Sequence, residues 1–393
     1  MADDHTDSDL RSPRATHAVH RSRVMATVTA AVAFVLAGCT PAPTPSLSSG
    51  AATPAPSASE PMSGTWTLDG EPEVLAHDLE APWSVIPLRQ GGALISQRDD
   101  GTVLELTASG SVRPVGTVPG VVSGGEAGLN GIALWTGDGD TWLYVYHASE
   151  SDNRVVRMPL DGESGSFSLG KPQVILSGIA KAGNHDGGRI AFGPDGMLYV
   201  TTGDAGLGDA AQDLGSLNGK ILRLTPEGRS APGNPFGTDV WSYVHRNVQG
   251  IAWTSDGVMW ASEFGQDTWD ELNAIEAGAD YGWPVVEGGA GDARYRDPLV
   301  VWATDDASPS GIAAVGDTIF LAALHGARLW RVDTTGEKVD GEPQVGLDGL
   351  GRLRDAVAAP DGSLWLLTNN TDGRGSPQPG DDLLLRVALA RDD

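Results

Sequence analysis

The 393-residue chain contains a single cysteine, Cys39. An intramolecular disulfide needs a pair of cysteines, so the folded part of the protein must be held by packing and hydrogen bonds alone. The attachment signature of a c-type haem, Cys-x-x-Cys-His, is absent for the same reason. The sequence therefore predicts neither a disulfide scaffold nor a covalently bound haem.

Basic residues are scarce. The 26 lysines and arginines are outnumbered by 52 aspartates and glutamates, which gives a formal net charge of -26. Such a charge repels the phosphate backbone of nucleic acids and the headgroups of an anionic membrane surface. We therefore expect no nucleic-acid partner. The charge suits cations and neutral substrates, and a simple role in solubility explains it equally well.

The apolar stretch VMATVTAAVAFVLA, residues 24 to 37, is too short to span a bilayer comfortably and follows several arginines. This pattern is typical of an export signal. Its end, Leu-Ala-Gly-Cys39, resembles the bacterial lipoprotein processing site, which predicts a signal peptide over residues 1–38 and a lipid on Cys39. We expect an exported lipoprotein that faces outside and touches the cell membrane only through its lipid anchor. A plain secretory signal or a membrane anchor, with a chance cysteine, is the alternative.

The segment that follows Cys39 is poor in residues that can form a core. Residues 40 to 64 are almost wholly Pro, Ala, Ser, Thr and Gly. Such a composition buries too little apolar surface to pay for ordering the chain. Residues 39–64 are therefore expected to form the lipidated end and a disordered linker, and residues 65–393 the folded domain.

Helical periodicity is nearly absent from the folded domain, and a β-hairpin pattern recurs instead. Each copy is a short apolar run, a turn with Asp-Gly or an equivalent, and a second apolar or aromatic run. Asp-Gly supplies the positive φ angles of a tight hairpin turn, and the flanking residues favour strands. The copies span residues 83–101, 131–148, 189–204, 250–265, 311–330 and 355–370.

The spacing of these hairpins predicts an all-β, six-bladed β-propeller. The turn glycines are 48, 57, 61, 59 and 46 residues apart, a range that fits propeller blades with added loops. Radial closure also removes exposed sheet edges, and residues 71 to 79 are expected to complete the last blade beside residues 383 to 389. A sandwich of two sheets with insertions is the alternative, but it does not explain six equivalent hairpins.

Polar residues stand directly before several of the apolar runs. Propellers place their sites in loops around one mouth of the central channel, at the starts of the innermost strands. Arginine pairs there would hold a ligand with several carboxylates. Each residue alone has a structural explanation, but their convergence from separate blades favours a binding site. The residues are Glu126, His185, Arg189, His245, Arg246, Asn247, Arg352 and Arg354.

The stretch EFGQDTWDELNAIEAGADYGWP, residues 263 to 284, is polar and rich in glycine and aromatic residues. Backbone carbonyls and carboxylates in such a loop would bind a calcium ion, because hard cations take oxygen ligands and glycine permits close approach. A purely structural loop is the alternative, and spacing alone does not separate the two.

Several motifs of this chain resemble those of the soluble quinoprotein aldose and glucose dehydrogenases, the glucose/sorbosone dehydrogenase family. They are GGEAGLNGIAL, NHDGGRIAFGPDGMLYVTTGD, LNGKILRL, HRNVQGIAW, SEFGQDTWDELN, ADYGWP and RLRDAVAAPDG. The resemblance extends over residues 74 to 388. It implies a six-bladed propeller with pyrroloquinoline quinone (PQQ) lying over the channel mouth. It also implies oxidation of the C1 hydroxyl of aldoses to lactones, assisted by calcium.

The resemblance also implies roles for particular residues. His185 falls on the general base that takes the proton from the anomeric hydroxyl as hydride passes to the quinone. The quinone-binding positions are occupied by Arg246, Asn247, Arg352 and Arg354. Gly265 and Gln266 fall on the residues whose main-chain carbonyls bind the active-site calcium, although the family usually has proline at the second position.

Other positions depart from the family pattern. His325 stands where glucose dehydrogenases have a quinone-contacting lysine, and Trp302 is expected to stack over the quinone. Glu126 and Asn184 stand at substrate-binding positions that hold glutamine and aspartate in the glucose enzyme, so the resemblance does not identify the sugar. Glu271 and Tyr281 correspond to a second calcium site.

The sequence thus predicts a quinoprotein oxidoreductase for aldose sugars. Its electrons must pass to an external acceptor, because no haem can be attached. A non-catalytic propeller that binds a glycan or a protein partner at the cell surface is the alternative, since a fold does not dictate an activity. A metal-dependent lactonase is less well supported, because the sequence has no obvious cluster of acidic ligands.

Overall fold

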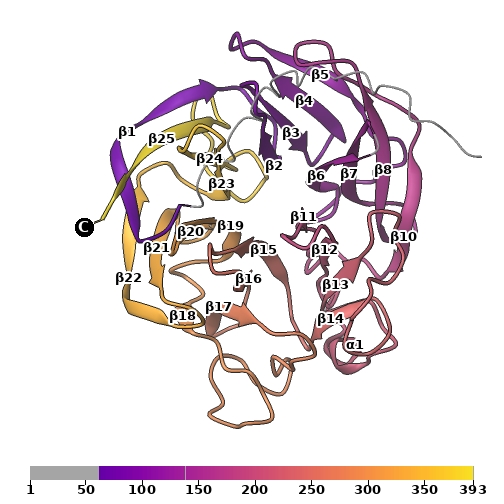
Figure 1. Ribbon diagram of the computed structural model, residues 1–393, viewed down its shortest axis with the longest axis vertical. Helices are drawn as coiled ribbons and strands as arrows, with labels where there is room; N and C mark the ends of the chain where they lie inside the picture. Colours follow the sequence, from indigo (N-terminus) through magenta and orange to yellow (C-terminus); the bar gives the residue numbers. More distant parts are fainter. Residues whose placement is uncertain (1–61, 138, 393) are drawn as a thin grey trace, which may run out of the picture. The chain divides into compact units, whose positions relative to one another are not determined.

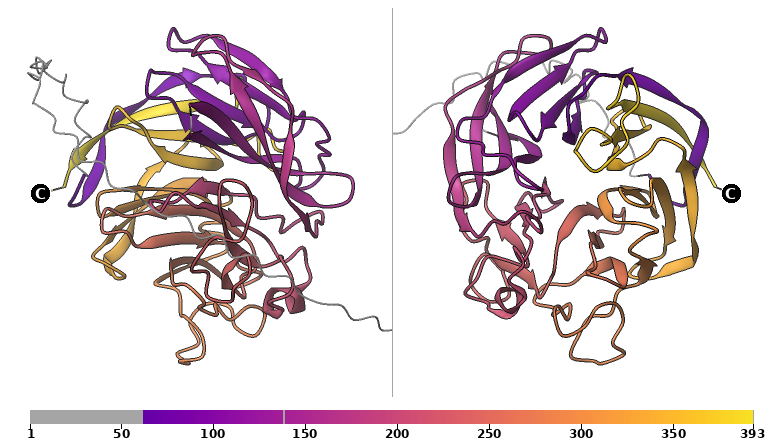
Figure 2. Two further views of the ribbon diagram at one scale, coloured as in Figure 1. Left: turned by 45° about the vertical axis from the view of Figure 1, so that its right-hand side comes forward. Right: turned by 180° about the vertical axis from the view of Figure 1, so that it is seen from behind.

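A computed structural model describes residues 62–137 and 139–392. The predicted signal peptide, Cys39 and the predicted linker up to residue 61 lie outside the described residues. The described strands form six antiparallel sheets, arranged radially around a common axis (Figures 1 and 2). The predicted six-bladed propeller is therefore confirmed, and the two-sheet sandwich is excluded.

The first three blades follow one another along the chain, and each runs outward from its first strand. Blade 1 comprises β2 (Pro82–Pro87), β3 (Ala93–Gln97), β4 (Thr102–Leu106) and β5 (Val112–Thr117). Blade 2 comprises β6 (Leu129–Gly137), β7 (Asp140–Ala148), β8 (Asn153–Asp161) and β10 (Gln173–Ile179), with β9 (Ser168–Leu169) paired to β8. Blade 3 comprises β11 (Ile190–Phe192), β12 (Leu198–Thr201), β13 (Lys220–Leu224) and β14 (Val240–Tyr243).

The last three blades complete the ring. Blade 4 comprises β15 (Val248–Trp253), β16 (Met259–Glu263), β17 (Trp269–Ile275) and β18 (Val300–Ala303). Blade 5 comprises β19 (Pro309–Val315), β20 (Thr318–Ala323), β21 (Arg328–Thr334) and β22 (Val339–Asp348). Blade 6 comprises β23 (Leu353–Ala358), β24 (Leu364–Thr368), β25 (Leu384–Arg391) and, from the start of the domain, β1 (Trp66–Ala76). A short helix, α1 (Gly208–Gln212), follows β12.

The predicted hairpins join the first and second strands of the blades. All six turn glycines have positive φ angles, between 59° and 89°. A side chain is strained in this region of backbone conformation, which explains why these positions hold glycine. The glycines are Gly91, Gly139, Gly196, Gly257, Gly316 and Gly362.

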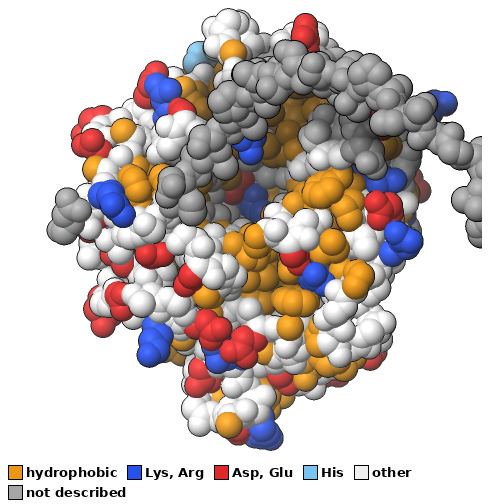
Figure 3. All heavy atoms as spheres, viewed as in Figure 1, with side chains coloured by type: hydrophobic (Ala, Val, Ile, Leu, Met, Phe, Trp, Pro, Cys, Tyr) orange, Lys and Arg blue, Asp and Glu red, His pale blue; other side chains and the backbone are white. Residues whose placement is uncertain are grey.

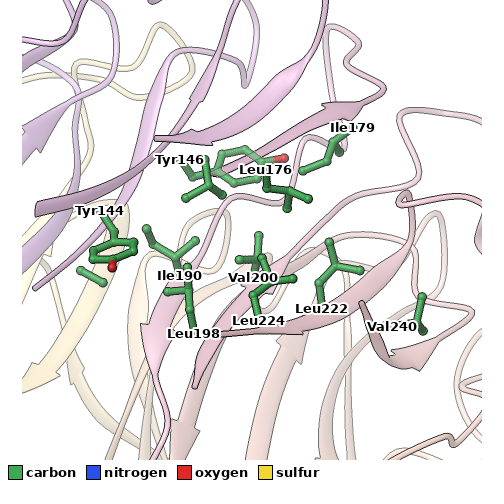
Figure 4. Packing of buried hydrophobic residues seen from close by; sticks show 12 residues of the cluster. Tyr144, Tyr146, Leu176, Ile179, Ile190, Leu198, Val200, Leu222, Leu224 and Val240 are labelled. Carbon is green, nitrogen blue, oxygen red and sulfur yellow. The ribbon is translucent and has the colours of Figure 1, made fainter. Parts of the chain in front are cut away.

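The hydrophobic core is divided among the junctions between blades. Buried apolar residues of the described chain form six clusters, each between two neighbouring blades. The cluster between blades 2 and 3 is typical: Tyr144 and Tyr146 from β7 face Ile190, Leu198 and Val200 (Figure 4). Each blade is thus buried on both faces, which allows the fold to dispense with disulfides.

The ring closes through strands from opposite ends of the domain. In blade 6, β1 pairs antiparallel with β25, with Val74 opposite Leu385 and Trp66 opposite Arg391, and Figure 1 shows the two strands side by side. The sequence predicted that residues 71 to 79 pair with the last strand. The partner strand is correct, but the closing strand starts earlier than predicted. The ladder begins at Trp66 and continues across an irregularity between Asp69 and Glu73. The turn-like Gly70 lies in this irregularity, which hides the continuity of the strand in the sequence.

Polar side chains cross the axis of the ring. Arg189, directly before β11 of blade 3, donates to Ser84 of blade 1 at 3.1 Å and to Asp355 of blade 6 at 2.8 Å. It also donates to the carbonyl of Gln249 in blade 4 at 3.0 Å. The guanidinium lies 4.3 Å from the ring centroid of the buried Trp83. One side chain thus contacts three other blades, which is possible only at the centre of the ring.

None of the helices in the described part of the chain has the length and apolar character needed to cross a membrane.

Truncation of Leu385 should weaken the closing blade. This buried residue packs in the cluster between blades 5 and 6. Leu385→Ala should lower the free energy of unfolding by about 2–5 kcal/mol, because it removes buried methyl groups and leaves a cavity. Val345, exposed on β22, provides the control, and Val345→Ala should change stability by less than about 0.5 kcal/mol. Urea unfolding followed by circular dichroism measures both, and equal losses would contradict the placement of Leu385.

Candidate active site

The loops before the inner strands of blades 2, 3 and 4 meet through hydrogen bonds. The Oε2 atom of Glu126, before β6, accepts the N–H of His185 at 2.9 Å and the Nδ2–H of Asn247 at 3.4 Å. The Oδ1 atom of Asn247 in turn accepts the N–H of Gly187 at 3.0 Å. Three predicted site residues from three blades are therefore brought together.

The imidazole of His185 is held by a buried carboxylate. Its Nδ1 atom lies 2.7 Å from Oδ1 of Asp204, which also accepts the N–H of Gly206 and, on Oδ2, the indole N–H of Trp283, both at 2.8 Å. Burial acts to raise the pKa of Asp204, but these hydrogen bonds outweigh it and hold that pKa below its usual value. Because an ionised carboxylate only accepts, the neutral form of this imidazole carries its proton on Nδ1 and its lone pair on Nε2.

The backbone at His185 is unusual for a residue with a side chain. Its φ angle is 59°, in the left-handed region. Gly203 packs against it so closely that a Cβ atom there would lie 1.8 Å from the carbonyl oxygen of His185. The conformation of the histidine therefore depends on a glycine at position 203, and such local strain is common at functional sites.

Two arginines at the start of β23, Arg352 directly before it and Arg354 within it, share one carboxylate. Arg352 donates to Oδ2 of Asp372 at 2.9 Å, and Nη2 of Arg354 lies 3.7 Å from the same atom. Arg354 also donates to Oε1 of Gln249 at 2.8 Å. Burial lowers the pKa of Arg354 to about 9, and the charge of Asp372 opposes this effect. The region thus concentrates positive charge away from water in a protein that is acidic as a whole.

Three arginine N–H donors near the mouth are buried and have no hydrogen-bond partner among the described residues. They are Nη1 of Arg98, Nη2 of Arg189 and Nε of Arg246. A second nitrogen of Arg98 donates to the carbonyl of Asp372 at 3.2 Å, which joins this residue to the arginine pair. Unpaired buried donors are costly, and arginines bind carboxylates well. The residues present therefore fit a ligand with several carboxylates, such as the tricarboxylic quinone that the sequence resemblance implies.

Arg374 connects the histidine side of the site to the arginine side. It lies in the loop between β24 and β25, and its Nη1 atom is 3.6 Å from Oε1 of Glu126. Its N–H donates to Oδ1 of Asp372 at 2.9 Å. His185 and Arg354 are thus linked through a short chain of polar contacts and lie at the same end of the ring.

A cleft of about 530 Å³ opens beside His185. Its walls include side chains from four separate segments of the chain. They are His185, Asp204, Gln266, and the group Trp283, Pro284, Val285 and Glu287. The guanidinium of Arg246 lies 5.4 Å from the ring centroid of Trp283. The space-filling view of the ring shows a hollow at its centre, with Lys or Arg atoms visible at depth (Figure 3).

The segment after β16, residues 265–269, is tied to acidic side chains through its backbone. A single oxygen, Oε1 of Glu287, accepts the N–H groups of the four consecutive residues 266–269 at 2.7 to 3.1 Å. Burial acts to raise the pKa of Glu287, but these bonds outweigh it and lower that pKa. The N–H of Gly265 donates to Oδ1 of Asp270 at 2.9 Å.

In the part of the chain that the structure describes, no three His, Cys, Asp or Glu side chains are grouped so that they could hold a metal ion. The calcium predicted from the sequence would instead use the main-chain oxygens of Gly265 and Gln266, a type of ligand that hard cations accept. The donor set fits calcium in its chemistry, and Gln266 lines the cleft beside His185.

The geometry agrees with comparisons to known proteins. A model of the Glucose / Sorbosone dehydrogenase family matches residues 79–386. The chain belongs to the glucose/sorbosone dehydrogenase family. The match includes blades 1 to 5 and, in blade 6, all but β1 and the end of β25, and it includes every loop described above.

Relatives of this family member include proteins of named activity. The structure of the PQQ-bound form of an aldose sugar dehydrogenase from Streptomyces coelicolor is 48% identical, with a TM-score of 0.78, and the match covers 84% of this chain and 99% of that chain. An aldose sugar dehydrogenase of Escherichia coli K12 is 28% identical, over 77% of this chain and 90% of its own. Quinoprotein glucose dehydrogenase B of Acinetobacter calcoaceticus is 29% identical, and the match covers 57% of this chain and 54% of that protein.

Trp302 does not lie at the mouth as a stacking residue requires. It belongs to β18, the outer strand of blade 4, and only 6% of its surface is exposed. Its ring packs in the core between blades 4 and 5, where the centroid of Trp330 is 5.7 Å away. The indole has almost no free face, so this placement argues against the stacking contact predicted for it.

His325 and Asn184 are more exposed than the other site residues. The side chain of His325, in the loop after β20, is 59% exposed, and its Nδ1 atom lies 3.3 Å from the carbonyl of Thr304 and 3.4 Å from Asp305. Neither neighbour belongs to the arginine cluster, so its predicted cofactor contact has no structural support. Asn184 is exposed in the loop beside His185, where a substrate would reach it.

Glu271 and Tyr281 are buried beneath the 265–269 segment. Burial, together with the charge of Glu263, raises the pKa of Glu271 to about 8. The hydroxyl of Tyr281 donates to the carbonyl of Ala274 at 2.8 Å, and its ring stacks on His245 at 4.5 Å. The pocket that both residues border measures about 10 Å³, room for one water molecule at most. These contacts give both residues structural roles and offer no support for a second calcium site.

Sequence reasoning missed several residues that build the site, among them Arg98, Asp204, Glu287 and Asp372. Three of them, Arg98, Asp204 and Asp372, follow the second strand of a blade. A hairpin returns the chain to the end from which it started, so residues after a second strand lie beside those before the first strand. The hairpin pattern itself therefore held the signal for these three.

Asp186, next to His185, is a buried carboxyl with an incomplete set of partners. Its Oδ1 atom accepts Nδ2–H of Asn153 at 2.7 Å, while its Oδ2 atom has no hydrogen-bond partner among the described residues. Burial raises the pKa of Asp186 to about 6. An amide would keep the bond to Asn153 without introducing a buried charge.

Asp186→Asn should therefore stabilise the protein at pH 8 more than at pH 4. The folded pKa of about 6 lies above the usual value of 3.8, so ionisation lowers stability as the pH rises through this range, and the full cost is reached above pH 6. The stability difference between variant and wild type should be about 2 kcal/mol larger at pH 8 than at pH 4. Denaturant unfolding at both pH values measures it, and a pH-independent difference would contradict the assignment.

Proposed function

We propose that this protein oxidises the C1 hydroxyl of aldose sugars to lactones with PQQ as its bound cofactor, assisted by calcium. One observation carries the proposal. A histidine oriented by a buried aspartate, His185 with Asp204, lies at the edge of a cleft and is linked to buried arginines that have unpaired donors. Family membership and the named activities of the relatives support the same reaction class.

The arginines would hold the carboxylates of the quinone. Arg352 and Arg354 supply fixed positive charge, and the unpaired donors of Arg98 and Arg189 would be satisfied by carboxylate oxygens. Asn247 donates to Glu126, and the guanidinium of Arg246 lies 5.4 Å from the ring centroid of Trp283 in the cleft wall, so both would contact the quinone there. When bound, PQQ supplies the two-electron oxidant that the amino acids lack.

His185 would act as the general base. Its Nδ1–H is fixed on Asp204, so Nε2 is free to take the proton from the anomeric hydroxyl while hydride leaves C1. The Asp204 carboxylate then stabilises the imidazolium that forms. This arrangement orients the base before the sugar arrives, which lowers the cost of reaching the reactive geometry.

Glu126 and Asn184 are proposed to contact the sugar. Glu126 already holds the backbone of His185 through Oε2, and its Oε1 atom faces Arg374. Hydrogen bonds from sugar hydroxyls to this carboxylate would place C1 near the base. The reaction leaves two electrons on the enzyme, and a separate acceptor molecule would remove them.

Calcium is proposed to bind the main-chain carbonyls of Gly265 and Gln266. The second calcium site predicted at Glu271 and Tyr281 is not part of this proposal, because their polar groups are already engaged.

We also propose that the protein is exported and anchored outside the cell by a lipid on Cys39. Support comes from the sequence alone, since these residues lie outside the described part of the chain. Substrates and the electron acceptor would then meet the enzyme at the cell surface.

Titration with PQQ in the presence of calcium, followed by absorbance, tests cofactor binding. The wild type should bind, and Arg352→Ala should weaken binding by about 10- to 100-fold, because it removes a charge-assisted contact worth about 1.5–3 kcal/mol. Arg229, on the β13–β14 connection with a side chain that is 78% exposed, gives the matched control, and Arg229→Ala should bind as the wild type does. A folded wild type that binds no PQQ would instead favour the non-catalytic propeller.

His185→Gln should abolish turnover but spare the cofactor. Reduction of an artificial dye by aldoses should fall by about 10²- to 10⁴-fold, the usual contribution of a general base. PQQ affinity, measured by the same absorbance titration, should stay within about 2-fold of wild type because His185 makes no part of the arginine cluster. Loss of both properties together would contradict the role of base.

A further inference from the structure

Four N–H groups converge on Glu287, and their direction determines where the carbonyl groups of the same peptides point. In a planar trans peptide the C=O of one residue is directed opposite to the N–H of the next. The N–H groups of Gln266 and Asp267 donate to Oε1 of Glu287 at 2.7 and 3.0 Å. The carbonyls of Gly265 and Gln266 belong to these same two peptides, so both are directed away from Glu287. They are the two carbonyls assigned to calcium.

The turn is too tight to keep this shape without support. At Gly265 a Cβ atom would lie 1.9 Å from the carbonyl oxygen of Trp269 and 2.8 Å from Oε1 of Glu287. The N–H groups of Thr268 and Trp269 donate to the same carboxylate oxygen at 2.9 and 3.1 Å. Five residues are therefore wrapped around one carboxylate oxygen, which accepts the N–H groups of four of them.

Glu287 is itself held on both sides. The N–H of the preceding Val286 donates to the carbonyl of Gly282 at 2.8 Å, and the N–H of the following Gly288 donates to Oε1 of Glu271 at 2.8 Å. The buried Glu271 thus anchors the segment that carries Glu287. The position of the carboxylate is fixed by the loop between β17 and β18, which is far in sequence from the carbonyls it organises.

We propose that Glu287 is the positioning residue of the calcium site. It does not act as a calcium ligand through Oε1, which is occupied by four N–H donors, but it aligns the carbonyls of Gly265 and Gln266 by directing both away from its own carboxylate. This inference rests on the proposed function, because it needs the calcium assigned there. It gives the acidic side chain in the loop after β17 a role in the site although that side chain takes no part in the reaction.

Calcium titration into the metal-free protein with stoichiometric PQQ, followed by absorbance, tests the inference. Glu287→Ala should weaken calcium binding at least about 10-fold, because two carbonyls lose their fixed direction. Glu287→Gln keeps an acceptor oxygen of similar shape and should show a smaller loss. PQQ affinity measured without calcium should be unchanged in both variants, whereas a general structural defect would lower it.

Asp297 supplies a matched control on the same loop. Its carboxylate also accepts consecutive N–H groups, those of Ala290 and Gly291 at 2.7 and 2.9 Å, but among the described residues it has no hydrogen bond to residues 265–269. Asp297→Asn should leave calcium affinity at the wild-type value. Unfolding in denaturant without calcium verifies that each variant is folded. If Glu287→Ala is not folded, the calcium affinities of Glu287→Gln and Asp297→Asn are compared to test the positioning role.

Two failures are distinguishable. A wild type that binds PQQ but shows no calcium binding would remove calcium from the proposed function. A wild type that binds calcium, with an unchanged affinity in both Glu287 variants, would overturn the positioning role alone. An equal loss of calcium affinity in Asp297→Asn and Glu287→Gln would also overturn the positioning role, because the effect would then come from the loop as a whole.

Discussion

The pairing of β1 with β25 is the constraint on which the rest of the molecule depends. A blade buries its faces only against its neighbours, so an open row of blades would expose two flat apolar sheets. Joining the first strand of the domain to the last strand closes the row and gives each junction its own core. Closure also brings loops that are far apart in sequence around one axis. The site from Glu126 to Asp372 exists only because the ring is complete.

Charge is distributed unevenly across this closed ring. The protein carries many more acidic than basic residues, yet buried arginines gather where the blades meet. Arg189 and Arg354 are partly compensated by Asp355 and Asp372. Nitrogens of Arg98, Arg189 and Arg246 that have no hydrogen-bond partner among the described residues fit the carboxylates of an anionic ligand. A carboxylate-rich cofactor would satisfy these nitrogens, which explains how an acidic protein can hold an acidic ligand.

Acidic side chains serve the backbone as much as the surface. Asp204, Asp270 and Glu287 all accept main-chain N–H groups around the cleft. Each turn that they hold lacks regular pairing, and a carboxylate satisfies more donors than a neutral acceptor does. Part of the negative charge that suggested solubility from composition is therefore used to shape the site. The orientation of His185 and the direction of the Gly265 and Gln266 carbonyls depend on these bonds.

The sequence by itself determined the repeat, and with it the blade count, the hairpin turns and the identity of the closing strands. It also determined which loops meet, because residues before inner strands must lie at one end; this placed His185, Arg246, Asn247, Arg352 and Arg354. The tertiary structure decided what each residue touches. Trp302 is in the core between blades, whereas Asp204, Arg98 and Glu287 are in the site. Local sequence patterns predict strands and turns, because both depend on residues that are neighbours in the chain. Contacts across blades depend on how closed sheets pack, and that information is spread over the whole ring.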